Sequence, residues 1–457
     1  MATQAEQVSA GLTLSNFAQA TDLKKRLWFT LLALIVFRIL SYVPLPGIDP
    51  VAMSEVFQRN SGGVLDLFNN FSGGALQRMS IIAVGVMPYI TASIVIQLST
   101  SLSPALGTLK KEGESGRKKL NQYTRYLTVL LTTIYGFSVA SALLASHTAA
   151  GQSVAYQGGT LFYISTITAL VGGTMFLMWL GEQITSRGIG NGISLIIMAG
   201  IVSQLPGAIG GMFESVRTGS GQFNALTVIF IIVLTVLMIA FICFMERAQR
   251  RIVIQYPKRQ TTRGIQQQQS FLPLKINTAN VIPPIFASSL LAFPTTLLGW
   301  FGKSATANNT TGDVILTITS LLRPGQWLHA LLYGLLIVFF CFFYSAITFN
   351  PEETADNLKR HGGFIPGIRP GKNTSEYLDY VLTRITVVGA AYLTLICLVP
   401  EVLVANISPS LSRLGGTGLL IVVNVTIDTV TQIQGHLLAH QYGDLLKKAK
   451  LKGGRSR

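Results

Sequence analysis

Three short patterns in the sequence could support chemistry, and each lacks a residue that the chemistry requires. His436 and His440 have the i, i+4 spacing of a zinc site, but no glutamate follows the first histidine. The Gly-Lys pair at 371–372 resembles the end of a phosphate-binding loop, but Pro366 stands where that loop requires glycine. Ser194 has no histidine in its own or an adjacent apolar stretch to activate it as a nucleophile. The sequence therefore indicates no enzyme active site, no cofactor and no metal site.

Apolar pairs at helical spacing form a second recurrent pattern. Val86 and Ile90 lie four residues apart and would share one face of a helix, and Ile193 and Ile197 repeat that spacing. Such pairs normally indicate packing, so the residue types alone do not identify a pore.

Ten mostly apolar stretches dominate the chain. A helix needs about 20 predominantly apolar residues to cross a bilayer, and most of the stretches supply that many. Because only helices and closed barrels pair all their backbone groups in lipid, and the stretches are too long for barrel strands, we expect ten transmembrane helices. The stretches are Leu27–Val43, Met79–Ser99, Tyr126–Ser146, Thr160–Gly181, Gly188–Phe213, Ala225–Met245, Ile276–Gly302, Gln326–Asn350, Ile385–Pro400 and Ser412–Ile433.

Basic residues gather on one side of these stretches. Most of the 35 lysines and arginines fall at the N-terminus, in loops after even-numbered stretches and in the tail from Lys447. By the positive-inside rule, both termini and those loops face the cytoplasm. The net charge of +16 suits two kinds of partner, anionic lipid headgroups or an acidic macromolecule such as RNA.

The overall composition agrees with a membrane protein. Hydrophobic residues make up 49% of the chain, charged residues only 12%, and the mean hydropathy is +0.48. The three cysteines lie inside apolar stretches, so no disulfide framework is expected. Residues 1–20 are polar and lack the apolar core of a cleavable signal peptide.

Several polar residues and prolines interrupt the apolar stretches. Arg38, Gln97 and Asp428 lie at membrane depth, where polar groups are costly and usually face the protein interior or water. We expect Arg38 and Asp428 to be structural charges. The proline pair at 283–284 and Pro294 should break the seventh helix into a kinked or moving element.

A polar, glycine-rich stretch runs from Asn69 to Arg78, directly into the second apolar stretch. Adjacent glycines disfavour a continuous lipid-facing helix, so we expect a short re-entrant element that lines a cavity. The alternative is an ordinary external loop.

Two cytoplasmic loops are too long and too patterned to be simple connections. The loop Glu246–Lys275 partly alternates apolar and polar residues, which predicts a hairpin that projects from the membrane. In the loop Asn350–Arg384, Asn350 can cap a short helix, and a rigid turn then presents Arg369. Two basic protrusions on one face indicate docking of a large partner, although each alone could be a solvated loop. The basic residues of the first protrusion are Arg250, Arg251, Lys258, Arg259 and Arg263.

Long motifs cover much of the chain. They run from Asn70 to Leu76, Gly85 to Ile90, Lys111 to Arg117, Gly181 to Gly192 and Phe349 to Gly371. These motifs resemble those of the bacterial SecY family, the channel subunits of the protein-conducting Sec translocon. The similarity extends over nearly the whole chain.

The resemblance implies an all-α integral membrane protein of ten transmembrane helices. These would form two inverted five-helix halves around an hourglass channel with a plug, and a lateral gate would open between the second and seventh helices. The halves would be residues 1–213 and 214–433, followed by a basic cytoplasmic tail, 434–457. The plug would lie within residues 61–78, with Phe71, Ser72, Gly73, Gly74, Ala75, Leu76 and Arg78 as its matched residues.

The resemblance also implies roles for other residues. The lateral gate would include Thr91, Gln97 and Phe293. Val86 replaces an isoleucine that relatives commonly carry, and Gly264 replaces the second of two arginines at the tip of the first protrusion. A pore ring of branched aliphatic side chains would comprise Val86, Ile90, Ile193, Ile197, Ile285 and Ile421.

The implied function is a passive channel. It would pass unfolded secretory polypeptides across the bacterial plasma membrane and release transmembrane segments into lipid, driven by the SecA ATPase or a translating ribosome. Signal peptides would open it, and the SecE and SecG subunits would accompany it. Two alternatives exist: a secondary transporter would explain the broken helices but lacks an evident coupling-ion site, and an intramembrane hydrolase lacks a nucleophile–base pair.

Overall fold

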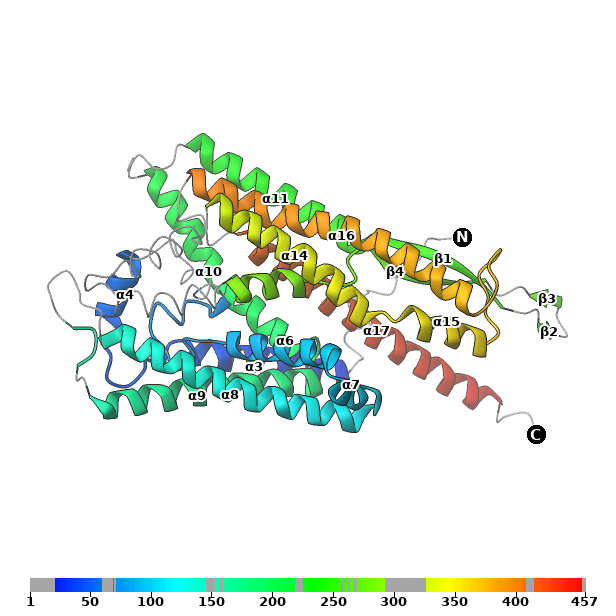
Figure 1. Cartoon of the computed structure of the whole chain (residues 1–457), viewed down its shortest axis with the longest axis horizontal. Coiled ribbons are helices and arrows are strands. Elements are labelled where there is room, and N and C mark those ends of the chain that lie inside the picture. Colours follow the sequence, from blue (N-terminus) through cyan, green and yellow to red (C-terminus); the bar gives the residue numbers. More distant parts are fainter. Residues whose placement is uncertain are drawn as a thin grey trace.

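Long helices make up most of the described chain (Figure 1). The structure is a computed structural model, and it describes residues 21–59, 69, 71–144, 153–156, 159–217, 225–256, 259–261, 264–266, 269–291, 326–407 and 415–453. The helices before residue 218 are α3 (Thr21–Leu40), α4 (Pro50–Arg59), α6 (Met87–Leu102), α7 (Pro104–Lys111), α8 (Glu114–Leu144), α9 (Thr160–Arg187) and α10 (Gly192–Arg217). Those after it are α11 (Ala225–Arg247), a short helix Ile282–Leu291, α14 (Trp327–Thr348), α15 (Pro351–Arg360), α16 (Lys372–Ile407) and α17 (Gly416–Gly453).

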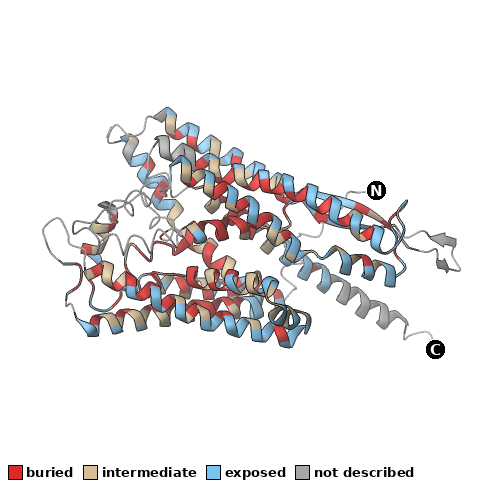
Figure 2. Cartoon of the chain, viewed as in Figure 1, coloured by how far each residue is buried: buried red, intermediate tan, exposed pale blue. Residues whose placement is uncertain are grey.

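The helices form two groups. In Figure 1, α3, α6, α8 and α9 lie together on one side, α11, α14 and α16 lie on the other, and α10 crosses between them. Buried residues concentrate where the two groups face each other, and the outer faces are largely exposed (Figure 2). This distribution is typical of helices whose outer faces meet lipid.

Seven of the described helices are long and apolar enough to cross a membrane. They correspond to the predicted third to sixth and eighth to tenth stretches. The other three predicted stretches correspond to α3, with 20 residues, to α6, with 16, and to the helix Ile282–Leu291. Several helices start before their predicted boundaries: α8 begins at Glu114 and α16 at Lys372.

The predicted start of the second spanning helix at Met79 is wrong, because α6 begins at Met87. Met79 and Gly85 have φ of +48° and +62°, left-handed conformations that a right-handed helix cannot contain. Ser80 instead pairs with Pro44 in an antiparallel bridge. The chain therefore stays non-helical for eight residues longer than its hydropathy suggested.

The prolines at 283–284 interrupt the seventh stretch near its start, as predicted, but they begin a helix rather than kink one. The two prolines lie in the first turn of the helix Ile282–Leu291. The missing N–H of proline costs no helical hydrogen bond there, so the pair starts the helix. Pro294, the other predicted break, lies outside the described residues.

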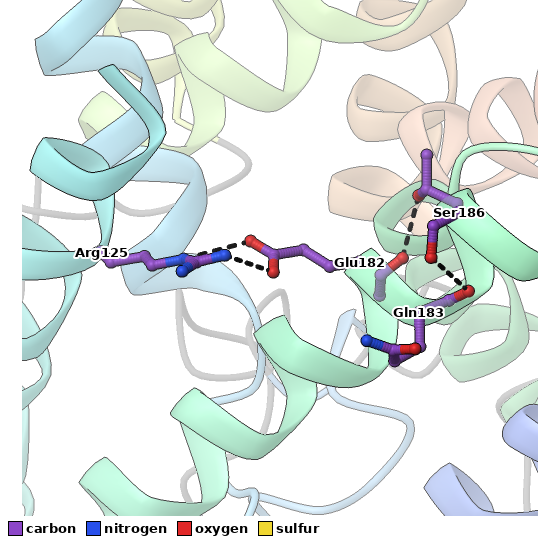
Figure 3. Close-up of polar contacts among 6 residues, drawn as sticks. Arg125, Glu182, Gln183 and Ser186 are labelled. Atoms are coloured by element: carbon purple, nitrogen blue, oxygen red, sulfur yellow. Dashed lines mark hydrogen bonds and ion pairs between the residues drawn. The ribbon is translucent and has the colours of Figure 1, made fainter. Parts of the chain in front are cut away.

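An ion pair joins α8 to α9. Arg125 Nη2 lies 2.5 Å from Glu182 Oε2, and Arg125 Nε lies 3.3 Å from Glu182 Oε1, so the guanidinium holds the carboxylate with two bonds (Figure 3). Further along the same helices the backbones approach closely, since a Cβ added at Gly136 would lie 3.4 Å from the Cα of Ile167. Small residues at such crossings are the usual means of packing helices in lipid.

The loop between α9 and α10 joins the first and last helices. The Ile189 N–H donates to Thr30 Oγ1 of α3 at 3.1 Å, and the Gly190 N–H donates to Gln432 Oε1 of α17 at 2.9 Å. The Ile189 side chain is buried in a small cluster with Leu23 and Leu437. The loop at residues 188–191 therefore connects α3, near the start of the described chain, to α17, at its end.

The hairpin predicted for Glu246–Lys275 is confirmed. Strand β1 (Gln249–Gln255) pairs antiparallel with β4 (Gln269–Lys275), and β2 (Arg259–Thr261) pairs with β3 (Gly264–Gln266). The hairpin extends beyond the helices at the same end as α15 and the C-terminal part of α17 (Figure 1).

The predicted cap of α15 is confirmed as well. Asn350 Oδ1 accepts hydrogen bonds from the backbone N–H groups of Glu352 at 3.1 Å and Glu353 at 3.4 Å. Pro351 occupies the first position, where its missing N–H is harmless. Acidic residues in the first turn and Lys359 and Arg360 in the last turn complement the helix dipole.

Replacing Asn350 with alanine should therefore loosen the first turn of α15. Loss of an N-cap costs about 1 kcal/mol, which corresponds to roughly fivefold faster hydrogen exchange of the Glu352 and Glu353 amides. The measurement is residue-resolved hydrogen exchange in detergent. Asn350→Asp keeps the acceptor oxygen and should exchange at the parent rate. Equal exchange in all three proteins would show that the cap does not stabilise this turn.

Candidate functional site

The six residues predicted as a ring belong to one apolar cluster of the structure, which we call the aliphatic cluster. Val86, Ile90, Ile197, Ile285 and Ile421 are buried in it, and Ile193 packs against it. Ile421 exposes 1% of its surface, and Ile90 and Ile285 expose 7%. The six come from α6 and the turn before it, from α10, from the helix Ile282–Leu291 and from α17. The same cluster also contains Met238 of α11 and Ile337 of α14, so elements from both groups of helices meet in it.

The two pairs with i, i+4 spacing are built differently. Ile193 and Ile197 both lie within α10. Val86 instead lies just before α6, at its N-cap, and its carbonyl accepts a hydrogen bond from the Ile90 N–H at 3.1 Å. Both pairs nevertheless contribute to the aliphatic cluster.

The residues Phe71–Arg78, which we call the glycine-rich segment, lie against this cluster. Phe71 and Ala75 are buried within it, whereas Leu76 packs in a second cluster with Leu45 and Met79. The segment is made mostly of turns, and Gly73 and Gly74 have φ of +70° and +81°. Only glycine adopts two such conformations in succession without strain.

The glycine-rich segment also touches the backbone of α10. A Cβ added at Gly200 would lie 2.8 Å from the Phe71 carbonyl oxygen, and one added at Gly73 would lie 3.0 Å from the Gly200 Cα. Any larger residue at Gly200 would therefore push the segment away. Gln204, one turn further along α10, donates to the Asn69 carbonyl at 2.6 Å.

Asn69, two residues before the glycine-rich segment, accepts several of its hydrogen bonds. Its carbonyl also accepts from the Gly74 N–H at 2.9 Å and from the Ser72 hydroxyl at 3.2 Å. Its side-chain oxygen accepts from the Gln77 N–H at 3.0 Å. These bonds satisfy backbone groups that are buried away from water and would otherwise be costly.

Two arginines contact the Gly73 carbonyl, namely Arg78 from within the glycine-rich segment and Arg38 from α3. The sequence indicated Arg38 only as a structural charge. Arg38 Nη1 donates to the Gly73 carbonyl at 2.9 Å, and Arg78 Nη2 lies 3.5 Å from the same oxygen. Both guanidinium groups lie over the ring of Tyr42, at 4.8 Å and 4.1 Å from its centroid. The signal that could have identified Arg38 is its position as a charge inside an apolar stretch.

Thr91 and Gln97, predicted at the lateral gate, both lie on α6. Thr91 donates to the Met87 carbonyl at 3.1 Å and also bonds Tyr135 of α8. Gln97 donates to Ser93 Oγ at 3.2 Å. All these contacts stay within the N-terminal group of helices. Phe293, the third predicted gate residue, lies outside the described residues.

A buried polar network that the sequence did not reveal lies at the base of the first protrusion. Glu246, near the end of α11, is buried and accepts from Asn277 Nδ2 at 2.7 Å and from the Tyr392 hydroxyl at 3.5 Å. Nearby, Lys275 pairs with Asp428 of α17 at 3.6 Å. The network joins α11, α16 and α17 to the segment that leads into the helix Ile282–Leu291.

The two protrusions, β1–β4 and the loop Asn350–Arg384, pack on each other. Gln255 at the end of β1 and Phe364 after α15 exchange two backbone hydrogen bonds, each 2.9 Å long. Beneath this bridge, Ile252, Leu274 and Ile365 share a buried apolar cluster with residues of α16. The two loops therefore form one ordered unit.

The basic residues predicted for docking are spread over this unit. Arg250 and Arg251 are exposed at the start of β1, close to the end of α11. Arg369 is exposed in the turn between Gly367 and Gly371, both of which have positive φ. Arg259 lies in β2 at the tip, and Lys258 and Arg263 lie outside the described residues.

The part of the chain that the structure describes contains no group of three or more His, Cys, Asp or Glu residues that could hold a metal ion. Cys341 and Cys397 are buried in the aliphatic cluster, and Cys243 packs against it.

Comparisons with known proteins agree on one family. The SecY family model matches residues 80–430. Protein translocase subunit SecY of Vibrio cholerae serotype O1 is 51% identical over 434 residues, which are 95% of this chain and 96% of the relative. The same subunit of Escherichia coli K12 is 50% identical, over 94% of this chain and 96% of the relative, and that of Rickettsia typhi is 51% identical, over 96% and 99%.

Solved structures show the same fold. A SecY structure in which the plug domain stabilises the closed state of the channel matches with a TM-score of 0.64 at 18% identity, over 91% of this chain and 92% of that one. Sec61 in the canine ribosome–channel complex matches with a TM-score of 0.61 at 17% identity, over the same shares. From the family model and the half-identical relatives together, the chain belongs to the SecY family of multi-pass membrane proteins.

Proposed function

We propose that this chain is the protein-conducting channel of a Sec translocon in the bacterial plasma membrane, with both termini in the cytoplasm. Unfolded secretory polypeptides would pass through the aliphatic cluster, and transmembrane segments would leave it sideways into lipid. The observation that carries the proposal is the aliphatic cluster, where branched side chains from both groups of helices meet and bury part of the glycine-rich segment.

The aliphatic cluster suits a passive pore for a physical reason. Branched aliphatic side chains offer no hydrogen bonds, so a polypeptide moving past them has no strong binding site to leave. The same side chains close on each other when the pore is empty, and a narrow apolar constriction resists water and ions by dewetting. The ring comprises Val86, Ile90, Ile193, Ile197, Ile285 and Ile421.

The glycine-rich segment would be the plug. Phe71 and Ala75 would fill the space on one side of the ring, and the turn at Gly73 and Gly74 would lie against α10. Because turns and hydrogen bonds hold this segment rather than a continuous helix, it can leave the pore without unwinding a spanning element.

The lateral gate would lie between α6 and the helix Ile282–Leu291, with Thr91, Gln97 and Phe293 along it. The channel would consist of two halves, residues 1–213 and 214–433, with a cytoplasmic tail, 434–457. A signal peptide that binds the separated halves better than the closed ones would shift the population toward the open state.

The ordered cytoplasmic unit would be the docking site for the SecA ATPase or a translating ribosome. Its exposed arginines, Arg369 above all, would pair with acidic protein side chains or with RNA phosphates. SecE and SecG would be the accompanying subunits.

Replacing Ile90 and Ile197 together with glycine should make the resting channel conduct ions, because the constriction loses the side chains that close it. The measurement is single-channel or bulk conductance in planar bilayers without substrate. The control replaces Leu143 and Leu170 with glycine, because both are buried in helices but belong to the second apolar cluster, outside the aliphatic cluster. Each change costs the helix about 1 kcal/mol in either variant, so a general loss of stability affects both equally. If the double variant at Ile90 and Ile197 shows the same resting conductance as the parent, these residues contribute to packing but do not seal the channel.

Arg369→Glu should leave the channel assembled and reduce SecA-driven translocation of a preprotein by at least about tenfold, as expected when a charge-assisted contact becomes repulsive. The measurement is protease protection of the preprotein in vesicles that contain equal amounts of channel. The matched control is Arg360→Glu, which reverses another exposed charge of the same unit at the end of α15. Normal translocation by Arg369→Glu would remove this residue from the docking site.

A further inference from the structure

Arg38 makes a set of contacts that an ordinary buried charge would not need. From the last turns of α3, its Nη1 donates to the Gly73 carbonyl at 2.9 Å and to Ser203 Oγ of α10 at 3.1 Å. Its Nη2 donates to the Tyr42 hydroxyl at 2.8 Å. One guanidinium thus holds α3, the glycine-rich segment and α10 together.

The charge of Arg38 is balanced without a carboxylate. Among the described residues, the ion pairs join Lys118 to Glu114, Arg125 to Glu182 and Lys275 to Asp428, and none includes Arg38. Its partners are a backbone carbonyl, three hydroxyls (those of Ser41, Tyr42 and Ser203) and the face of Tyr42. Such contacts hold a cation in a low-dielectric site but are weaker than a buried ion pair, so they can break and re-form.

Arg78 reinforces the same arrangement from inside the glycine-rich segment. Its guanidinium lies 4.1 Å from the centroid of Tyr42 and donates to the Gly74 carbonyl at 3.3 Å. The ring of Tyr42 therefore makes cation–π contacts with both arginines, one from α3 and one from the segment itself. The carbonyl of Gly73 lies between the two cations.

We propose that Arg38 is a positioning residue that pins the glycine-rich segment against α10 in the closed channel. Nη1 of the guanidinium holds the Gly73 carbonyl and Ser203 at once while Nη2 holds the Tyr42 hydroxyl, and the segment is released when the Nη1 bonds break. The proposal rests on the proposed function, because only a channel needs a segment that is held and released.

The test measures the position of the segment and the seal of the channel separately. Ser72, which exposes 3% of its surface, is replaced with cysteine in a chain whose three native cysteines are alanine, and its rate of labelling by a membrane-impermeant maleimide is measured without substrate. Resting ion conductance is measured on the same protein. Arg38→Gln should raise the labelling rate about tenfold, as expected for loss of charge-assisted hydrogen bonds, and should raise the conductance.

Two further variants separate geometry from charge. Arg38→Lys keeps the charge but has a single nitrogen, so it cannot bond Gly73 and Ser203 while a second nitrogen bonds the Tyr42 hydroxyl, and it should label as fast as Arg38→Gln. Arg26→Gln removes a cation from the other end of α3, where it donates to the Gly188 carbonyl, and should label at the parent rate. Parent-like labelling in Arg38→Gln, or full restoration by Arg38→Lys, would overturn the proposal.

The two readouts distinguish this inference from the proposed function. Faster labelling without added conductance would support Arg38 as the positioning residue and would refute the plug assignment. If Arg38→Gln does not accumulate in membranes, Ser203→Ala, which removes one acceptor, replaces it in the test. Ser203→Ala should label roughly threefold faster than the parent, in line with the loss of a single hydrogen bond, and an unchanged rate would overturn the proposal.

Discussion

The close approach of two backbones, at Gly73 in the glycine-rich segment and Gly200 in α10, is the contact on which the rest of the site depends. It brings an irregular segment to membrane depth, where every unpaired N–H and C=O is costly. Asn69 and Gln204 pair these groups, and Arg38 adds a charged donor. Because lipid offers no hydrophobic drive for helix association, such polar and close-packed contacts must hold the segment in place.

Apolar and polar contacts have different roles in the structure. The aliphatic cluster lies where the two groups of helices meet, and in the proposed channel it would close without forming bonds that a passing chain would have to break. Polar contacts link neighbouring elements to each other. Arg125 and Glu182 join α8 to α9, and Gly190 and Gln432 join the loop before α10 to α17. The network around Glu246 extends these polar contacts to the base of the unit formed by the two protrusions.

Local sequence signals predicted the elements that depend on local physics. The cap at Asn350 and the alternation in Glu246–Lys275 led to a helix start and a hairpin that the structure confirms. The start of α6 was missed because hydropathy continues through residues 79–86, whereas the left-handed conformations of Met79 and Gly85 depend on tertiary contacts. Contacts over long sequence separations, such as Arg38 with Ser203 or Gln255 with Phe364, leave no pattern in a single sequence. The grouping of the six aliphatic residues followed from family resemblance, not from spacing.

The central claim is that a polypeptide passes through the aliphatic cluster, and site-specific disulfide crosslinking tests it most directly. A secretory chain carrying one cysteine is stalled in the channel, and single cysteines replace Ile90, Ile197 or Ile285. Leu170 of α9, fully buried in the second apolar cluster, provides the control position. The account predicts crosslinks at all three positions, none at Leu170, and none when the signal sequence is removed. An engaged chain that crosslinks at none of the three would contradict the account.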